Sequence, residues 1–330
     1  MKKMRIAAVL MTAVLAMGPI QAQKVDFSTV SAPEESGIDF VRITQNGDYV
    51  YMPVVKRSAK GAFWDPNYIL DISKDGNDIA YLSTRNKTTN IFIKSLNKQG
   101  SSIQRTTRIN VVDFTYSPDG QYICFSEKRG KTTQIFQTSS TKGFVCRQFT
   151  SDNNDYAPMY SHDMKQVLFT RQENKSSSIW SYNIANNFLS TYTKGMCPYP
   201  ANEKDTYFCT RINNEGRGEV WKINYESGIE ECIISDYERS FSSPRLSPDG
   251  KWLLLTGSSK MINGKSGYWN ADIYVARLDG TSLSQLTFHG ADDVCPVWSK
   301  DGQFIYFISQ RGDAEKHANI WRMPFSEPEE

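Results

Sequence analysis

The chain repeats one short motif at nearly even intervals, and this repetition limits the possible folds more than any other feature. Ser-x-Asp-Gly occurs four times, starting at Ser73, Ser117, Ser247 and Ser299. Two degenerate copies fill the gap between them, SHDM at Ser161 and ANEKD at Ala201. The six starts are separated by 44, 44, 40, 46 and 52 residues. Such a period is typical of repeat architectures, in which each unit buries its apolar face against a neighbour.

Each repeat has the same internal order of four short strands. An apolar strand ends at the Ser, Asp-Gly makes a tight turn, and a second apolar strand follows. A third strand begins with Ile or Val beside an aromatic residue, as in NIFIKSL and NIWRMPF, and a fourth ends in Thr or Ser. Four strands in about 40–45 residues are the signature of a propeller blade. The sequence therefore predicts an all-β fold, a six-bladed β-propeller.

The blades are expected within residues 39–326, with starts near residues 61, 111, 155, 196, 241 and 293. The last blade lacks a fourth strand of its own. Residues 40–44 (FVRIT) and 49–55 (YVYMPVV) resemble an N-terminal hairpin, and we expect one of these strands to pair with blade six. That pairing closes the ring and removes the exposed sheet edges. Residues 23–38 show little periodicity and are predicted to form an extended arm.

Residues 1–22 have the pattern of a secretory signal peptide: basic MKKMR, twelve apolar residues, and a small residue, Ala22, before the expected cleavage site. Twelve apolar residues are too few to cross ~30 Å of hydrocarbon as a helix, so an uncleaved anchor is the weaker alternative. The first cysteine is Cys124, which excludes a bacterial lipoprotein anchor. The chain carries 38 Lys and Arg against 36 Asp and Glu, and without residues 1–22, which hold three bases and no acid, the balance is −1. We expect an exported soluble protein, periplasmic or secreted, that does not bind nucleic acid.

Six cysteines lie in apolar strand-like runs without any C-x-x-C spacing. They are Cys124, Cys146, Cys197, Cys209, Cys232 and Cys295. Disulfides remain possible in an exported chain. Buried free thiols that act as small apolar side chains are the favoured interpretation.

The repeat unit resembles the repeats of TolB-type six-bladed propellers. The shared pattern is Pro-x-[Tyr/Trp/Leu]-Ser-Pro-Asp-Gly, then an apolar strand, then [Asp/Asn]-Ile-[Tyr/Trp]. Three parts of the chain carry it: residues 244–252, residues 296–312 with 319–321, and residues 116–130. The resemblance covers about four-fifths of the chain. It implies a cell-envelope protein that docks a peptidoglycan-associated lipoprotein at its channel mouth. TolB-like proteins also carry an α/β domain before the propeller, but only about 38 residues separate the leader from blade one here, so that domain's role is not carried over.

Similar blades also cap prolyl-oligopeptidase-like hydrolases and build oligogalacturonate-lyase-like enzymes. A serine peptidase needs a G-x-S-x-G elbow on an α/β-hydrolase domain, and the sequence contains neither. A metal-dependent lyase needs converging His and carboxylate ligands. His289, His317 and Asp292 are expected on one rim of blade six, so a divalent metal held there is an alternative to ordinary surface polarity. His162 replaces Pro in a turn on the opposite rim and is predicted to be exposed to solvent.

The loops after the second and fourth strands of each blade lie on one face, around the channel mouth. The first set carries recurrent basic residues, among them Arg85, Arg129, Arg171, Arg211 and Arg311. The second set carries acidic residues, among them Asp155 and Asp293. An inner acidic and outer basic pattern suits docking of a polar protein segment. The alternative, that each arginine hydrogen-bonds within its own blade, stays open.

The longest of these loops is predicted at residues 257–272 of blade five. It contains Tyr268 and Trp269. Exposed aromatic residues between flexible glycines suit a clamp on a partner or glycan. The equal alternative is that both residues begin the third strand and belong to the core.

Together these features predict a monomeric, non-catalytic interaction module of the cell envelope. It has no membrane span and no cofactor, and its partner binds at the channel mouth. The competing hypothesis is a carbohydrate-active propeller enzyme that uses the blade-six histidines and a divalent metal.

Overall fold

The computed structural model describes residues 32–328, except 54, 59–60, 65–67, 99, 108, 142–144, 175, 264–265 and 314. The predicted signal peptide, residues 1–22, and most of the predicted arm lie outside these described residues. In the described part of the chain, no helix has the length and hydrophobicity needed to cross a membrane.

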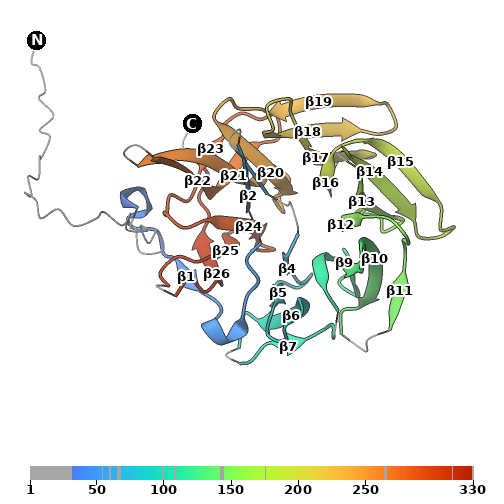
Figure 1. Cartoon of the computed structure of the whole chain (residues 1–330), viewed down its shortest axis with the longest axis horizontal. Helices are drawn as coiled ribbons and strands as arrows, with labels where there is room; N and C mark the ends of the chain where they lie inside the picture. The colour runs from blue at the N-terminus through green and yellow to red at the C-terminus, as the bar shows by residue number, and fades with distance from the viewer. Residues whose placement is uncertain are drawn as a thin grey trace, which may run out of the picture.

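Six antiparallel four-stranded sheets are arranged around a central axis, which confirms the six-bladed propeller (Figure 1). The first five blades each use four consecutive strands. Blade one comprises β4 (Leu70–Ile72), β5 (Asp78–Ser83), β6 (Asn90–Ser95) and β7 (Ile103–Gln104); blade two β8 (Val111–Tyr116), β9 (Tyr122–Arg129), β10 (Thr132–Ser139) and β11 (Cys146–Gln148); blade three β12 (Asp155–Tyr160), β13 (Gln166–Glu173), β14 (Ser176–Asn183) and β15 (Leu189–Lys194); blade four β16 (Met196–Pro200), β17 (Thr206–Ile212), β18 (Gly218–Asn224) and β19 (Ile229–Ile234); blade five β20 (Arg239–Leu246), β21 (Trp252–Asn263), β22 (Ser266–Arg277) and β23 (Ser284–Gln285).

Blade six is assembled from both ends of the chain. Its first three strands are β24 (Asp293–Trp298), β25 (Phe304–Ser309) and β26 (Asn319–Pro324), and its outer strand is β1 (Val41–Arg42). Val41 lies opposite Arg322, and Arg42 lies opposite Trp321. The predicted closure of the ring by an N-terminal strand is therefore confirmed.

The predicted N-terminal hairpin does not form. After β1 the chain makes a 3-10 turn, η3 (Asn46–Asp48), and Val50 then bridges to Ser83 of blade one instead of returning along β1. The Asn-Gly pair enters η3 because the side chains of Gln45 and Asp48 cap its backbone. A separate hairpin of β2 (Val55–Ser58) and β3 (Gly61–Trp64) follows, so the segment near residue 61 precedes blade one, whose first strand starts at Leu70.

The Ser-x-Asp-Gly motif forms the turn between the first and second strands of a blade. In blade two the Ser117 hydroxyl donates to Asp119 and accepts from the Tyr122 N–H at 2.9 Å. Gly120 has a φ of 75°, in the left-handed region that favours glycine. In the degenerate copy of blade three, Met164 occupies the same position with a φ of 57°. The turn thus persists where the glycine is lost.

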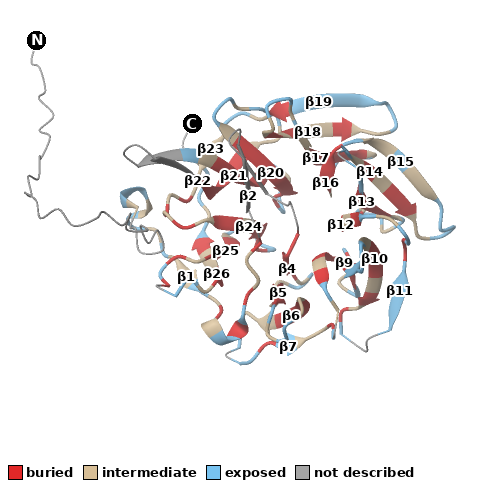
Figure 2. Cartoon of the chain, viewed as in Figure 1, coloured by how far each residue is buried: buried red, intermediate tan, exposed pale blue. Residues whose placement is uncertain are grey.

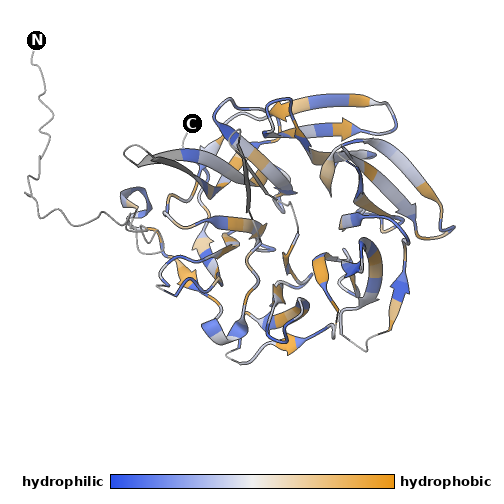
Figure 3. Ribbon diagram, viewed as in Figure 1, coloured by the Kyte–Doolittle hydropathy of each residue, from blue (hydrophilic) through white to orange (hydrophobic). Residues whose placement is uncertain are grey.

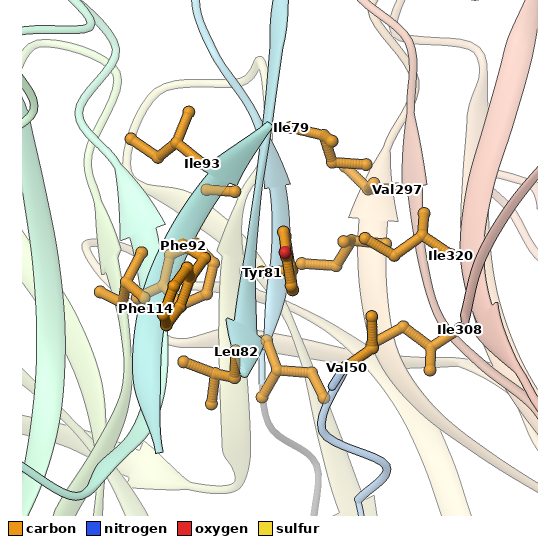
Figure 4. Packing of buried hydrophobic residues seen from close by; sticks show 14 of the residues in the cluster. Val50, Ile79, Tyr81, Leu82, Phe92, Ile93, Phe114, Val297, Ile308 and Ile320 are labelled. Atoms are coloured by element: carbon orange, nitrogen blue, oxygen red, sulfur yellow. The ribbon is translucent and has the colours of Figure 1, made fainter. Parts of the chain in front are cut away.

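The apolar core is divided among the interfaces between neighbouring blades. Figure 2 shows buried residues concentrated on the inner strands, while the outer strands β11 and β19 are largely exposed. Hydrophobic residues occur in every blade instead of forming one continuous apolar layer (Figure 3). The largest cluster joins blades six, one and two and includes Val50 of the N-terminal segment (Figure 4). Each blade therefore depends on its neighbours for burial.

The six cysteines form no disulfide bonds with one another. Cys124, Cys197 and Cys209 are buried, as predicted, and Cys295 is partly buried. The prediction of burial is wrong for Cys146 and Cys232, which are exposed. Both lie on the fourth strand of a blade, whose outer edge faces solvent.

Candidate functional site

The propeller has two unlike faces. The turn face carries the Ser-x-Asp-Gly turns and the connections from third to fourth strands. The loop face carries the connections from second to third strands and from each fourth strand to the next blade. The predicted binding residues belong to the loop face.

Side chains of the protein itself fill the centre of the ring. Tyr68, which is 1% exposed, reaches across from blade one, and its hydroxyl donates to the carbonyl oxygens of Cys197 and Pro244 at 3.0 and 3.3 Å. The Arg245 guanidinium of blade five lies 4.7 Å from the centre of the Tyr68 ring. It also donates to the Leu70 carbonyl at 2.7 Å. The side chains of Tyr68 and Arg245 therefore close the channel at this level.

The five predicted loop-face arginines all stack on an aromatic ring of their own blade. The distances from guanidinium carbon to ring centre are 4.8 Å for Arg85 on Phe92, 4.3 Å for Arg129 on Phe136, 4.2 Å for Arg171 on Trp180, 4.4 Å for Arg211 on Trp221 and 5.1 Å for Arg311 on Phe307. Each also pairs with a carboxylate. These contacts match the alternative in which the recurrent arginine organises its own blade.

The two predicted acidic residues are partners of these arginines. Asp155 accepts two hydrogen bonds from Arg171, at 2.7 and 2.9 Å, and both side chains are buried. Asp293 is fully buried and pairs with Arg311 in the same way. In these two pairs the acidic and the basic side chain therefore bind each other inside one blade. Neither carboxylate is presented to solvent.

The start of the described chain is fastened to the same part of blade six. Glu35 accepts hydrogen bonds from Arg311 at 3.0 and 3.1 Å and from the Phe288 N–H at 2.7 Å. The Arg311 guanidinium carbon lies over the face of the Phe40 ring, 4.2 Å from the ring centre. One arginine thus joins the N-terminal segment to the C-terminal blade, a contact that the sequence analysis did not predict.

Asp272 on β22 is a further buried carboxyl that the sequence analysis did not predict. It is 1% exposed, and its Oδ1 has no hydrogen-bond partner among the described residues. Burial, with the nearby charge of Asp293, raises the pKa of Asp272 to about 9. Blades one and six have the neutral Asn90 and Asn319 at the equivalent position, just before the Ile of the third strand. A protonated, neutral Asp272 fits this pattern.

The residues of the alternative metal site have other contacts. His289 is buried and its Nδ1 accepts from the Ala291 N–H at 3.0 Å; burial, followed by the charge of Arg311, lowers the pKa of His289. Asp292 accepts from the Ala271 N–H at 3.0 Å, and His317 lies 3.4 Å from Asp313. Among the residues that the structure describes, no three His, Cys, Asp or Glu side chains form a group able to hold a metal ion.

His162 lies on the turn face and is exposed, as predicted. It borders a pocket of 240 Å³ that Arg245 and Trp298 also line. The pocket therefore opens on the turn face, beside the Arg245 side chain that crosses the channel.

The predicted long loop of blade five is a strand hairpin. Residues 257–272 belong almost entirely to β21 and β22, which are paired from Trp252–Arg277 out to Asn263–Ser266. Tyr268 and Trp269 therefore lie in β22, and the loop interpretation is wrong for both. Trp269 is half-buried. The polar and glycine residues that suggested a loop extend the ladder, because those at 257–263 have cross-strand partners at 266–272.

Two tyrosines are prominent on the loop face. Tyr49, just before the Val50 bridge, is 53% exposed, and its carbonyl accepts from the Thr84 N–H at 3.0 Å. Tyr237, in the connection from blade four to blade five, is 87% exposed. Sequence analysis missed both, because single aromatic residues in loops carry no periodic signal.

A family model of the TolB beta propeller domain matches residues 21–202, which is more than half of the chain. The chain belongs to the TolB beta propeller family. A curated relative, the uncharacterized protein Atu1656 of Agrobacterium fabrum, is 26% identical over 99 residues. That match spans 30% of this chain and only 31% of the relative, so the comparison is confined to about a third of each protein.

Solved structures of TolB proteins share the fold of this TolB-family propeller. A putative TolB from Agrobacterium tumefaciens superposes with a TM-score of 0.59 at 16% identity, over 81% of this chain and 93% of that one. TolB from Acinetobacter baumannii gives 0.58 at 17% identity, over 77% and 65%. Oligogalacturonate lyase from Vibrio parahaemolyticus gives 0.56 at 12% identity, over 89% and 95%. At such low identities these likenesses show the fold alone.

Proposed function

We propose that this protein is a non-catalytic protein-binding module of the bacterial cell envelope, which docks a partner on its loop face around the channel mouth. The observation that carries the proposal is that two tyrosines on that face, Tyr49 and Tyr237, are exposed to solvent. Tyrosine combines a large apolar surface with a polar tip and is enriched among residues that dominate binding energy at protein interfaces. Membership of the TolB family supports the same role.

The loop face also has the rigidity that docking favours. Arg171 and Arg311 are held by buried carboxylates and by aromatic rings, so the loops beside them are fixed before a partner arrives. A preformed surface loses less conformational freedom on binding. The paired arginines therefore support the binding surface, and exposed residues such as Tyr49 and Tyr237 make the contacts.

The site is proposed to be non-catalytic because its polar groups already serve the fold. For the carbohydrate-active alternative, His289 would have to release the Ala291 N–H before its Nδ1 could bind a metal. No contact in the described part of blade six favours that exchange over the existing hydrogen bond.

The proposed location is the periplasm, and the proposed partner is an envelope protein like the peptidoglycan-associated lipoprotein. The location rests on the signal-peptide pattern of residues 1–22. The partner class rests on the resemblance to TolB.

The test measures capture of envelope proteins on the immobilised chain by quantitative mass spectrometry. We expect one envelope protein to be recovered at least tenfold above blank beads, and the double variant Y49A/Y237A to lose most of it. The matched control is Phe188→Ala, because Phe188 is an aromatic residue of similar exposure, 64%, on the turn face. Equal recovery by all three proteins would overturn loop-face docking. Arginine variants are less informative here, because the arginines also hold the blades together.

A further inference from the structure

A polar groove of 1320 Å³ runs along the outer wall of the ring, at the seam between blades six and one. Residues 42–48, which include the end of β1 and all of η3, form one side. Residues 94–98, 100 and 101, at the end of β6 and in the following turn, line the other side. Arg85 lies at the end nearer the loop face. The groove therefore extends from one face of the propeller towards the other, outside the channel.

The charge of the groove is mainly positive. Among the residues that the structure describes, the charged ones lining it are Arg42, Arg85, Lys94, Lys98 and Asp48. Four cations against one carboxylate leave a formal excess of three positive charges. The carboxylates of Asp78 and Asp313 lie close to the two ends without lining the groove. Such a local excess attracts anionic ligands and raises their association rate.

Asp48 holds two of the cations at the base of the groove. It is 6% exposed, and its Oδ1 accepts from Arg85 and from the Ser102 hydroxyl, both at 3.0 Å, while Oδ2 lies 3.5 Å from Lys94. The Nε of Arg85 is buried without a hydrogen-bond partner among the described residues. Asp48 thus orients Arg85 and Lys94 but offsets only one of their two positive charges, and Lys94 also donates to the Gly100 carbonyl at 3.0 Å.

The other two cations stand at the rims. Lys98 is exposed on the blade-one side, and Arg42 is exposed on the blade-six side, where it donates to the Thr44 carbonyl at 3.0 Å. A ligand in the groove would meet donors held by Asp48 below and exposed donors on both sides, of which Arg42 also donates to the Asn46 side chain. The amide side chains of Gln45, Asn46 and Asn97 add neutral donors and acceptors between them.

The lining chemistry fits a peptide better than a glycan. None of the described residues that line the groove is aromatic, whereas sugar sites commonly stack a ring on the apolar face of the saccharide. Amide side chains and the exposed main chain at Gly47 suit hydrogen bonding to an extended polypeptide, whereas the Gly100 carbonyl already accepts from Lys94.

We propose that this seam groove binds an extended acidic peptide segment whose carboxylates pair with Lys98, Arg42 and the two cations held by Asp48. This site goes beyond docking on the loop face, because it lies on the outer wall and would give a partner a second contact. Its ligand is defined by charge and extended shape, not by a particular sequence.

The test uses fluorescence anisotropy with a labelled, end-capped octaglutamate peptide, and octaglutamine as the uncharged probe. We expect saturable binding of octaglutamate that weakens at least tenfold between 50 and 200 mM salt, and no binding of octaglutamine. Lys98→Glu should weaken binding at least fivefold, and the double variant R42E/K98E further. If Arg42→Glu disturbs β1, the result is judged from Lys98→Glu alone.

The matched control is Lys165→Glu, which makes the same charge change at a lysine whose side chain is 77% exposed on the turn of blade three. Binding that falls equally in this control, or that ignores Lys98→Glu, would refute the groove site. A galacturonate octamer that binds more tightly than octaglutamate would refute the peptide assignment. Each of these outcomes is independent of partner capture by the loop-face tyrosines, so the two proposals fail separately.

Discussion

Blade two and blade six build the same sheet but obtain the outer strand in different ways. In blade two the Ile135 N–H donates to Thr150 Oγ1 at 3.0 Å, and both residues come from one continuous stretch of chain. In blade six the Ile320 N–H donates to Thr44 Oγ1 at 2.8 Å, across 276 residues. The hydrogen bond is the same, but in blade six no turn of the chain connects the third strand, β26, to the outer strand, β1.

Extra contacts replace the missing connection. Phe40 packs edge-on against Phe307, with ring centres 6.2 Å apart, and Glu35 binds Arg311 through both carboxylate oxygens. In blade two the corresponding Arg129 is half exposed and pairs with Glu127 of its own strand. The comparison teaches that the blade closed without a covalent link gains a second carboxylate and a second aromatic ring on its arginine from the N-terminal segment.

The largest expected difference between the two blades concerns these arginines. Arg311→Ala leaves the buried Asp293 carboxylate without its cation and frees Glu35, so we expect a loss of about 3–5 kcal/mol in the free energy of unfolding. Arg129→Ala removes a half-exposed pair and should cost less than about 1 kcal/mol. Urea unfolding at pH 7 measures both. Equal losses of unfolding free energy in the two variants would show that the arginine of blade six contributes no more to stability than that of blade two.

The next effect distinguishes the blades by pH. Asp113 of blade two is buried, and none of the described arginines forms an ion pair with it. Burial raises the pKa of Asp113 to about 7, although the Ser126 hydroxyl and the Ala157 N–H donate to it. Between about pH 4 and pH 7 the unfolded chain ionises this carboxyl while the folded chain keeps its proton, so stability falls as the pH rises. Asp113→Asn should remove about 2–3 kcal/mol of the loss between pH 5 and pH 8.

Thermal and urea unfolding at pH 5, 6, 7 and 8 test this prediction. Asp75→Asn is the control, because Asp75 is exposed and its pKa is lowered by hydrogen bonds from Ser73 and Asn77. If wild type and Asp113→Asn lose stability in parallel above pH 5, the carboxyl of blade two is not the group that titrates.

A smaller difference should separate the two outer-strand threonines. Thr44→Val and Thr150→Val each remove the acceptor of a buried Ile N–H, at a cost of about 1–2 kcal/mol. We expect the blade-six variant to lose more, because Thr44 Oγ1 also bonds to Asn319 Oδ1 at 3.0 Å. Serine at either position keeps the hydroxyl and should recover most of the stability in chemical denaturation. A greater loss for Thr150→Val would reverse the comparison.

The smallest effect concerns the turn face, where blade six has no closing role. Gly302→Ala and Gly120→Ala both place a β-carbon on a left-handed turn residue, with φ of 72° and 75°, at about 1 kcal/mol each. The new Cβ of Gly120→Ala would also lie 2.9 Å from the Lys74 Cβ, whereas that of Gly302→Ala meets nothing closer than 3.8 Å. Gly120→Ala in blade two should therefore lower the melting temperature more than Gly302→Ala in blade six. Differential scanning calorimetry measures both. A larger fall in melting temperature for Gly302→Ala would contradict this prediction and would show that the turn of blade six is the more sensitive of the two.

Most of the fold was predictable because its signals are local. The Asp-Gly turns and the short apolar strands lie within each repeat, and six such repeats indicate six blades. Ring closure by residues near 40–44 was also predictable, since blade six lacked a strand. The false hairpin arose because Asn46-Gly47 is a strong turn signal, which the capping side chains of Gln45 and Asp48 directed into a 3-10 turn instead.

The candidate site was much less predictable. The positions of Arg171 and Arg311 on the loop face follow from the repeat, but their partners do not. A charged residue next to a strand has the same sequence pattern whether it faces solvent or a buried carboxylate. Tyr49 and Tyr237 lacked any repeating signal, and the strand hairpin of blade five was hidden by its glycine and polar composition.

The sequence by itself determined the number of blades, the order of strands within each blade and the place of each turn, because these depend on residues only a few positions apart. Only the tertiary structure decided that Tyr68 and Arg245 close the channel, that Glu35 meets Arg311, and that the seam forms a basic groove. Tyr68 and Cys197 are 129 residues apart, and Glu35 and Arg311 are 276 apart. Such contacts depend on how the whole ring closes, which no local pattern specifies.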